Sequence, residues 1–270
     1  MDRQPKIQVM LGGKTPAQFM KLPKESRNEV FRRHLVQEDY VQIEEGDEED
    51  FFNPKLADGV LLRQEYFMGN DEVGKQLVEE AREIYYAENT FTVRSHWLCE
   101  FVRDTLADGK PIAIEPLVRR IMVQVDTEHI HDKDDFTYMP KGETEKSWVV
   151  RDLRQLLNFT NAEWIGIEVR GGGALDGSDL RTQQKIEEMS GIVKKLIDQF
   201  GEAFTIGKVA PKKPLFHNLR PYWDSPSAMA KQKLQAGKAS FEELMQIQVE
   251  EWTRVWPKTV QPGNRWESVL

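Results

Sequence analysis

Along this chain, segments whose hydrophobic residues have the spacing of a helix alternate with segments whose composition or spacing is typical of a strand. From residue 72 to residue 85 they recur three and four positions apart, which predicts an amphipathic helix. Residues 89–93 then combine β-branched and aromatic side chains, which predicts a short strand. The apolar positions of the predicted helix are Val73, Leu77, Ala81, Ile84 and Tyr85.

The same succession returns twice towards the C-terminus. Apolar and polar residues alternate over 120–125, and 164–169 is rich in apolar residues, so both segments are predicted strands. Helical spacing precedes the second of these strands at 150–157 and follows it at 186–200, and a last strand begins at 204–206. Strand, helix and strand in succession require crossover connections. We therefore expect an α/β fold with a small, mainly parallel sheet and irregular helical crossovers.

The ends of the chain differ from this central pattern. Residues 1–18 contain few periodic apolar positions and two adjacent glycines, so we expect a flexible lead-in. A helix begins at Leu22-Pro23, where proline is suited to a first turn because it lacks an N–H. Segment 241–256 carries two tryptophans at helical spacing and predicts a final helix packed on the core. We expect one domain, made of the lead-in, a helical module (19–88), a sheet region (89–210) and a basic linker with the C-terminal helix (211–270).

Two motifs in the first third of the chain resemble the filamentous-fungal F-box-like proteins. Residues 22–31 read LPKESRNEVF, which is similar to the L-P-x-E-x-R-N-x-[IV]-[FY] first helix of that group. Residues 79–91 read EEAREIYYAENTF, which is similar to its later E-A-x-x-[IL]-Y-Y-x-x-N-x-F segment. The order of the two motifs, separated by a variable insert, is also that of the group. The resemblance implies a helical F-box-like module at the N-terminus.

The resemblance also implies a role in protein recognition. The first helix of an F-box docks on the Skp-type adaptor of a cullin–RING ubiquitin ligase, and the rest of the protein recruits a target. Carried over to this chain, the contact residues are Leu22, Pro23, Val30 and Phe31. Ser26 departs from the pattern, because that position is normally aliphatic. We therefore expect a substrate-recruiting adaptor and not an enzyme, and the alternative that both motifs serve only the architecture of the fold stays open.

A metal- or nucleotide-binding hydrolase is the alternative from a different class. His129 and His131 stand two residues apart beside several aspartates, and these residue types ligate metals. Residues Gly171–Gly177 follow a predicted strand and precede a predicted helix, where backbone N–H groups can bind phosphate. Their spacing matches neither the dinucleotide fingerprint nor the P-loop. We favour a polar loop for the histidines and a helix cap at Asp176 or Ser178 for the glycine segment, and expect no metal or cofactor.

Charge and cysteine content set the remaining expectations. The chain has 37 Lys and Arg against 45 Asp and Glu, a net charge of -8, which argues against general binding to nucleic acid or anionic membrane. Its single cysteine, Cys99, can form no internal disulfide, and no apolar run is long enough to span a bilayer. We expect a cytoplasmic or nuclear protein.

Two clusters of charge stand out against this average. Residues 44–50 hold six acids in seven positions and predict a solvated loop. Residues 208–220 are basic and Pro-rich and contain no acid. Such a stretch could contact RNA or an acidic partner, or could receive the acidic residues of its own chain.

Overall fold

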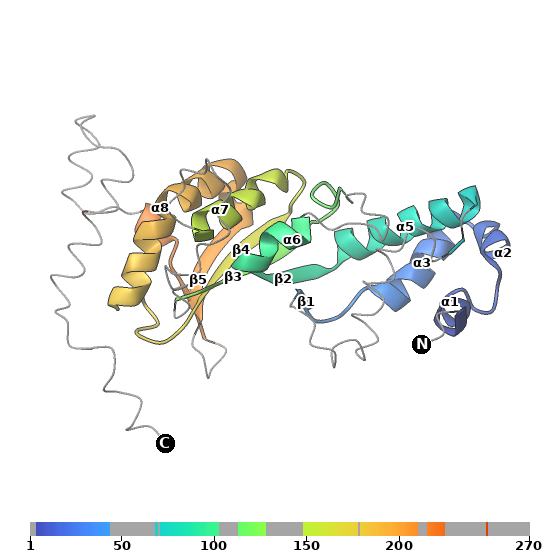
Figure 1. Cartoon of the computed structure of the whole chain (residues 1–270), viewed down its shortest axis with the longest axis horizontal. Coiled ribbons are helices and arrows are strands. Elements are labelled where there is room, and N and C mark those ends of the chain that lie inside the picture. The colour runs from blue at the N-terminus through green and yellow to red at the C-terminus, as the bar shows by residue number, and fades with distance from the viewer. Residues whose placement is uncertain are drawn as a thin grey trace, which may run out of the picture. The chain divides into compact units, whose positions relative to one another are not determined.

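The computed structural model describes residues 4–43, 68–69, 71–102, 113–127, 148–177, 179–209, 215–224 and 247 (Figure 1). Its contacts divide the chain into two compact units, and the organisation as one domain stays a prediction. Unit 1 comprises residues 1–122 and 158–164, and unit 2 comprises 123–157 and 165–270. The chain passes between the units at three points, inside β3, inside the 3-10 segment Gln155–Asn158 and inside β4, so the spacing of hydrophobic residues carries no signal of them.

The described strands form a six-stranded mixed sheet in the order β1-β2-β3-β4-β5-β6. The pairs β1/β2 and β4/β5 are parallel, and β6 runs antiparallel to β5. The α/β class predicted from the sequence is confirmed. The strands are β1 (Val41–Ile43), β2 (Thr90–Arg94), β3 (Arg120–Asp126), β4 (Trp164–Arg170), β5 (Phe204–Val209) and β6 (Phe216–Asn218).

Unit 1 begins with two helices in the segment where we expected a flexible lead-in. These are α1 (Gln4–Met10) and α2 (Pro16–Met20). Thr15 begins α2 with a capping box, in which its side chain accepts from the Gln18 backbone N–H and the Gln18 side chain accepts from the Thr15 N–H. Phe19 is buried. The threonine and glutamine three residues apart were the sequence signal for this helix.

The rest of unit 1 repeats a helix followed by a strand. Helix α3 (Lys24–Leu35) leads into β1, and α5 (Glu72–Glu88) leads into β2. Figure 1 shows α3 and α5 side by side, and Val41 pairs with Phe91 in the parallel strands that follow them. Strand β1 therefore lies inside the segment predicted as a purely helical module. Its three residues are too few to show an alternating pattern in the sequence. After β2 come a short 3-10 turn (Ser95–Trp97) and α6 (Leu98–Val102).

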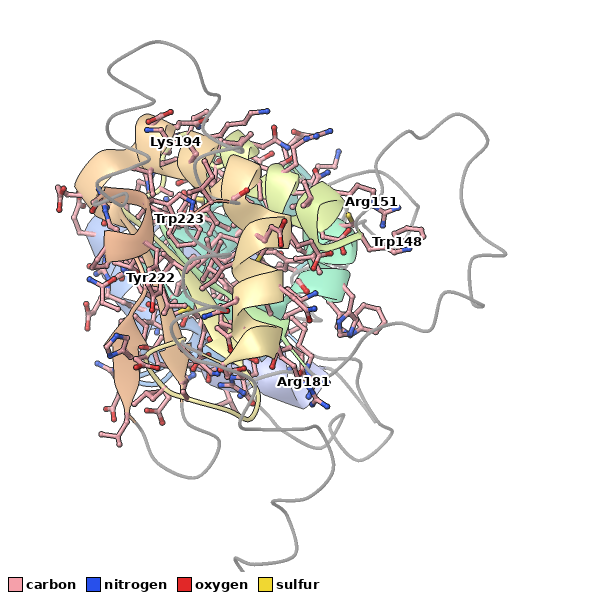
Figure 2. All side chains as sticks on the ribbon, turned by 90° about the vertical axis from the view of Figure 1, so that its left-hand side faces the viewer. Trp148, Arg151, Arg181, Lys194, Tyr222 and Trp223 are labelled. Carbon is pink, nitrogen blue, oxygen red and sulfur yellow. The ribbon has the colours of Figure 1, made fainter. Side chains whose placement is uncertain are left out.

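Unit 2 is built around one long helix. Helix α8 (Leu180–Phe200) buries the predicted apolar stripe, and Trp223 of α9 (Pro221–Asp224) donates from Nε1 to the Ser190 carbonyl at 3.2 Å (Figure 2). Helix α7 (Trp148–Arg154) carries Arg151, whose Cζ lies 4.0 Å from the centroid of the Trp148 ring. Two 3-10 segments complete the unit, Gln155–Asn158 and Gly201–Ala203. The buried positions of the α8 stripe are Ile186, Met189, Ile192, Val193 and Leu196.

Several predictions fall on residues that the structure does not describe. The acidic segment 44–50 and the pair His129 and His131 lie outside the described ranges. The predicted final helix at 241–256 also lies outside them, apart from Ile247, which is helical.

Candidate functional site

The Leu22-Pro23 corner predicted to bind an adaptor is held from behind by Arg27. Nη1 of Arg27 donates to the carbonyl oxygens of Met20, at 3.1 Å, and Leu22, at 2.5 Å. Nε and Nη2 donate to the two carboxylate oxygens of Glu80 on α5, at 2.8 and 2.6 Å. The Arg27 and Glu80 side chains are only 8% and 7% exposed. One guanidinium thus ties the turn between α2 and α3 to α5.

The contact between these side chains stabilises the charged form of both. Hydrogen bonding to Arg27 lowers the pKa of the Glu80 carboxyl below its ordinary value of 4.5, against burial, which raises it. The hydrogen bond to Glu80 in turn raises the pKa of the Arg27 guanidinium, against the opposing effect of burial. The pair is therefore a buried ion pair with bidentate geometry.

The second motif contributes a matching contact at the other end of the two helices. Nδ2 of Asn89 donates to the carbonyl oxygens of Tyr85, at 2.8 Å, and Leu35, at 3.0 Å. Oδ1 of Asn89 accepts from the Gln37 backbone N–H at 2.8 Å. The two motifs behind the F-box-like resemblance therefore contact each other. Glu80 and Asn89 join α5 to the α3 segment, which is an architectural role.

The four residues predicted to contact an adaptor differ in their exposure. Pro23 is exposed, and Leu22 and Val30 are half-buried. Phe31 is 0% exposed, and its ring centroid lies 5.6 Å from that of Phe19. Phe31 follows Arg27 by four residues, so both lie on the helix face that is turned inward. The structure thus places Leu22, Pro23 and Val30 at the surface and Phe31 in the core, where a partner cannot touch it.

The glycine segment of unit 2 contacts a buried lysine through the Gly172 carbonyl. Residues Gly171–Gly177 lie between β4 and α8, as the sequence predicted. Lys208 of β5 is 1% exposed, and its Nζ donates to the carbonyl of Gly172 (2.9 Å), the carboxylate of Asp179 (2.6 Å) and the hydroxyl of Thr182 (2.5 Å). An ammonium group has three N–H donors, so all of them are used.

The Asp179 carboxylate occupies the N-terminus of α8, where a bound phosphate would accept hydrogen bonds from backbone N–H groups. It accepts from the Thr182 backbone N–H at 3.0 Å and caps the helix, whereas we expected the cap at Asp176 or Ser178. Gly173 has φ +93°, and a Cβ there would lie 2.4 Å from the Asp179 side chain. The carboxylate therefore supplies the negative charge that the helix dipole favours. The Asp176 carbonyl instead accepts from the Tyr222 hydroxyl.

Two basic side chains of the stretch 208–220, Lys208 and Arg220, donate hydrogen bonds to groups of their own unit. Lys208 is engaged as described, and Nη1 of Arg220 donates to the carbonyls of Gly201 (2.7 Å) and Phe204 (2.9 Å). Lys212 and Lys213 lie outside the described residues. The sequence did hold a signal for Lys208, because it stands in an otherwise apolar strand between Gly207 and Val209.

The described residues contain neither a cluster of metal-binding side chains nor a membrane-spanning helix. Within the described ranges, no three or more His, Cys, Asp or Glu residues are grouped so that they could hold a metal ion. None of the helices in the described part of the chain has the length and apolar character needed to cross a membrane.

Comparison with known proteins adds no relative. The chain matches no protein-family model, no curated protein and no solved structure. The resemblance to F-box-like proteins therefore rests on the two motifs alone.

Proposed function

We propose that this chain is an intracellular, F-box-like protein-binding protein that recruits a target to a cullin–RING ubiquitin ligase. In this proposal the Leu22-Pro23 corner docks on a Skp-type adaptor. The observation that supports it most is the buried guanidinium of Arg27, which bonds the Leu22 carbonyl and holds the corner in one conformation. A preorganised corner loses little conformational entropy when a partner binds.

The proposed contact surface is smaller than the motif alone implies. It consists of Leu22, Pro23 and Val30, which reach the surface from one turn and one helix. Phe31 supports this surface from behind, through its packing on Phe19. Ser26 is exposed on the same helix, where its hydroxyl replaces the aliphatic group of the family pattern.

We propose a binding role and not catalysis for this protein. The hydrolase alternative gains no support from the glycine segment, because Lys208 and Asp179 already neutralise each other beside it. A bound phosphate there would compete with the Asp179 carboxylate for Lys208 and for the Thr182 N–H.

Binding to a purified Skp-type adaptor tests the proposal directly. The full chain is compared with a Leu22→Ala/Pro23→Ala variant by biolayer interferometry. We expect the affinity of the variant to fall at least tenfold, about 1.4 kcal/mol, because apolar anchors at the centre of an interface carry much of its binding energy. The thermal melt of the variant should stay close to that of the wild type, since the Leu22 carbonyl that Arg27 bonds is retained.

A matched control removes two side chains from the other unit. Lys194→Ala/Lys195→Ala on α8 should leave adaptor binding unchanged. A wild-type chain that does not bind the adaptor would overturn the ubiquitin-ligase proposal and leave both motifs with an architectural role only.

A further inference from the structure

Ser26 lies in the middle of the surface proposed to bind the adaptor. Pro23 precedes it by three residues and Val30 follows it by four, and residues three and four apart lie on the same side of a helix. Ser26 is exposed, whereas Arg27, the next residue, is turned inward and buried. A partner that covers Pro23 and Val30 therefore also covers the Ser26 hydroxyl.

The first turn of α3 accommodates a negative charge at Ser26. The helix begins after Pro23, whose side chain makes no capping hydrogen bond. Ser26 is the third residue of α3, so an anion on its side chain lies near the first N–H groups of the helix and the positive end of its dipole. A phosphate at this position is compatible with the folded helix.

The same charge is unfavourable for docking of the proposed contact surface. A phosphoserine carries a charge of about -1.5 to -2 at pH 7. Covering it together with the apolar side chains of Leu22, Pro23 and Val30 removes its water without supplying a counter-ion from this surface. Phosphate at Ser26 therefore separates folding of the corner from its binding.

The two cations within three residues of Ser26 already have partners. Three nitrogens of Arg27 donate to the Glu80 carboxylate and to the carbonyls of Met20 and Leu22. Nζ of Lys24 lies 3.8 Å from Oε2 of Glu83, and a residue two positions before Ser26 does not face it along the helix. Neither cation neutralises a phosphate at Ser26 in the arrangement that the structure shows.

We propose that Ser26 is a phosphorylation site and that its phosphate prevents docking on the Skp-type adaptor, a role that rests on the proposed function. The phosphoryl donor is a nucleoside triphosphate bound to a protein kinase. Oγ of Ser26 forms a bond to the terminal phosphorus, and the bond from that phosphorus to the bridging oxygen breaks. A nucleoside diphosphate leaves, and the hydroxyl proton passes to a base of the kinase.

Adaptor binding by the phosphorylated chain is the first measurement. The full chain, phosphorylated stoichiometrically at Ser26, is compared with the unmodified chain by biolayer interferometry. Its affinity should fall by about tenfold or more, while its melting temperature stays close to that of the unmodified chain. Ser26→Asp should weaken binding by a smaller factor, because it adds less charge. The control Thr160→Asp adds the same charge at an exposed position before β4 and should bind like the wild type.

The outcomes separate this role of Ser26 from the proposed function. Equal affinities of the phosphorylated and unmodified chains would overturn the role and leave adaptor binding standing. An unmodified chain that does not bind the adaptor would overturn both. A melting temperature that falls together with the affinity would also overturn the role, because damage to α3 would then explain the loss.

Mass spectrometry tests whether the modification occurs. The chain isolated from the cells that produce it should carry phosphate at Ser26 in a fraction of the molecules, and that fraction should be depleted among the molecules recovered with the adaptor. Absence of phosphate at Ser26, or equal phosphorylation of adaptor-bound and free molecules, would overturn the proposal.

Discussion

Glu80 of α5 accepts two hydrogen bonds from the guanidinium of Arg27 on α3, although 53 residues separate them in the sequence. Each residue belongs to one of the two motifs that resemble F-box-like proteins. Because both side chains are buried, the pair stabilises the packing of α3 on α5 only while it is intact. Removing one partner would leave a buried charge without its counter-ion.

The first prediction concerns the loss of one partner of this pair. Glu80→Ala should lower the free energy of unfolding by about 3–5 kcal/mol, since the Arg27 charge stays buried. Urea unfolding followed by circular dichroism measures the change. Arg27→Met/Glu80→Leu should recover part of this loss, because no unpaired charge stays buried. The recovery should be incomplete, because the carbonyls of Met20 and Leu22 lose their donor.

An exposed ion pair between the same two helices is the control for that prediction. Lys24 and Glu83 are 57% and 58% exposed, so Glu83→Ala should change stability by less than about 1 kcal/mol. Equal effects of Glu80→Ala and Glu83→Ala would contradict the role assigned to the buried pair.

The second prediction is a dependence of stability on pH that comes from Glu80. Its pKa is lower in the folded chain than in the unfolded chain, chiefly through the hydrogen bond from Arg27. The stabilisation is therefore complete above the unfolded pKa and is lost as the pH falls through the folded pKa. Unfolding measured from about pH 7 down to about pH 2 should show a smaller acid-induced loss for Glu80→Gln than for the wild type. Parallel curves for the two proteins would exclude Glu80 as the source.

The third prediction concerns Lys208 in unit 2. Lys208→Met should lower the free energy of unfolding by about 3–5 kcal/mol, because the partly buried Asp179 carboxylate and the Thr182 hydroxyl lose their cationic partner. Lys194→Met on the exposed face of α8 is the control, and its loss should stay within about 0.5 kcal/mol. If chemical denaturation gives similar midpoints for the two variants, the buried lysine is not a structural anchor.

The fourth prediction is that Gly74→Ala lowers the stability of the chain, although replacing a helical glycine by alanine usually raises it. In an ordinary helix interior, Gly→Ala stabilises by about 1 kcal/mol. A Cβ on Gly74 of α5 would lie 2.5 Å from the Gly69 carbonyl oxygen and 2.7 Å from that of Met68. Gly74→Ala should therefore destabilise the chain, by about 1–3 kcal/mol, because backbone must move. Thermal unfolding decides the sign, with the exposed Glu79→Ala on the same helix as the control.

Local spacing in the sequence was sufficient for the larger elements of the fold. The stripes at Leu77 and Ile84 and at Met189 and Leu196 correctly predicted α5 and α8, and alternating residues predicted β3. Strands β1 and β6 were missed, since each has only three residues and owes its conformation to a neighbouring strand. Helix α2 at the end of the expected lead-in was missed because its signal is a cap and not an apolar stripe.

Some features of the candidate sites were also visible in the sequence, and others were not. The corner at Leu22-Pro23 and the helix that follows it were visible as a motif, and the structure leaves Leu22, Pro23 and Val30 at the surface. Burial of Phe31 was not visible, because the face of α3 that is turned inward is determined by its packing on α5 and on Phe19 of α2. The use of Arg220 inside unit 2 was equally hidden, since basic residues close together in sequence are interpreted as a surface patch, whereas the position of Lys208 in a strand was a signal that this interpretation passed over.

The sequence by itself determined the α/β class and the order of the main helices and strands, and it contains the two motifs that resemble F-box-like proteins. These depend on interactions between residues a few positions apart, such as the three- and four-residue repeats of a helix. Only the tertiary structure decided that Arg27 pairs with Glu80, that Asp179 pairs with Lys208, and that β1 pairs with β2 among the described strands. Each of these contacts joins segments that are distant in the chain. A buried charge is costly unless it is paired, so its partner is determined by which segments pack around it.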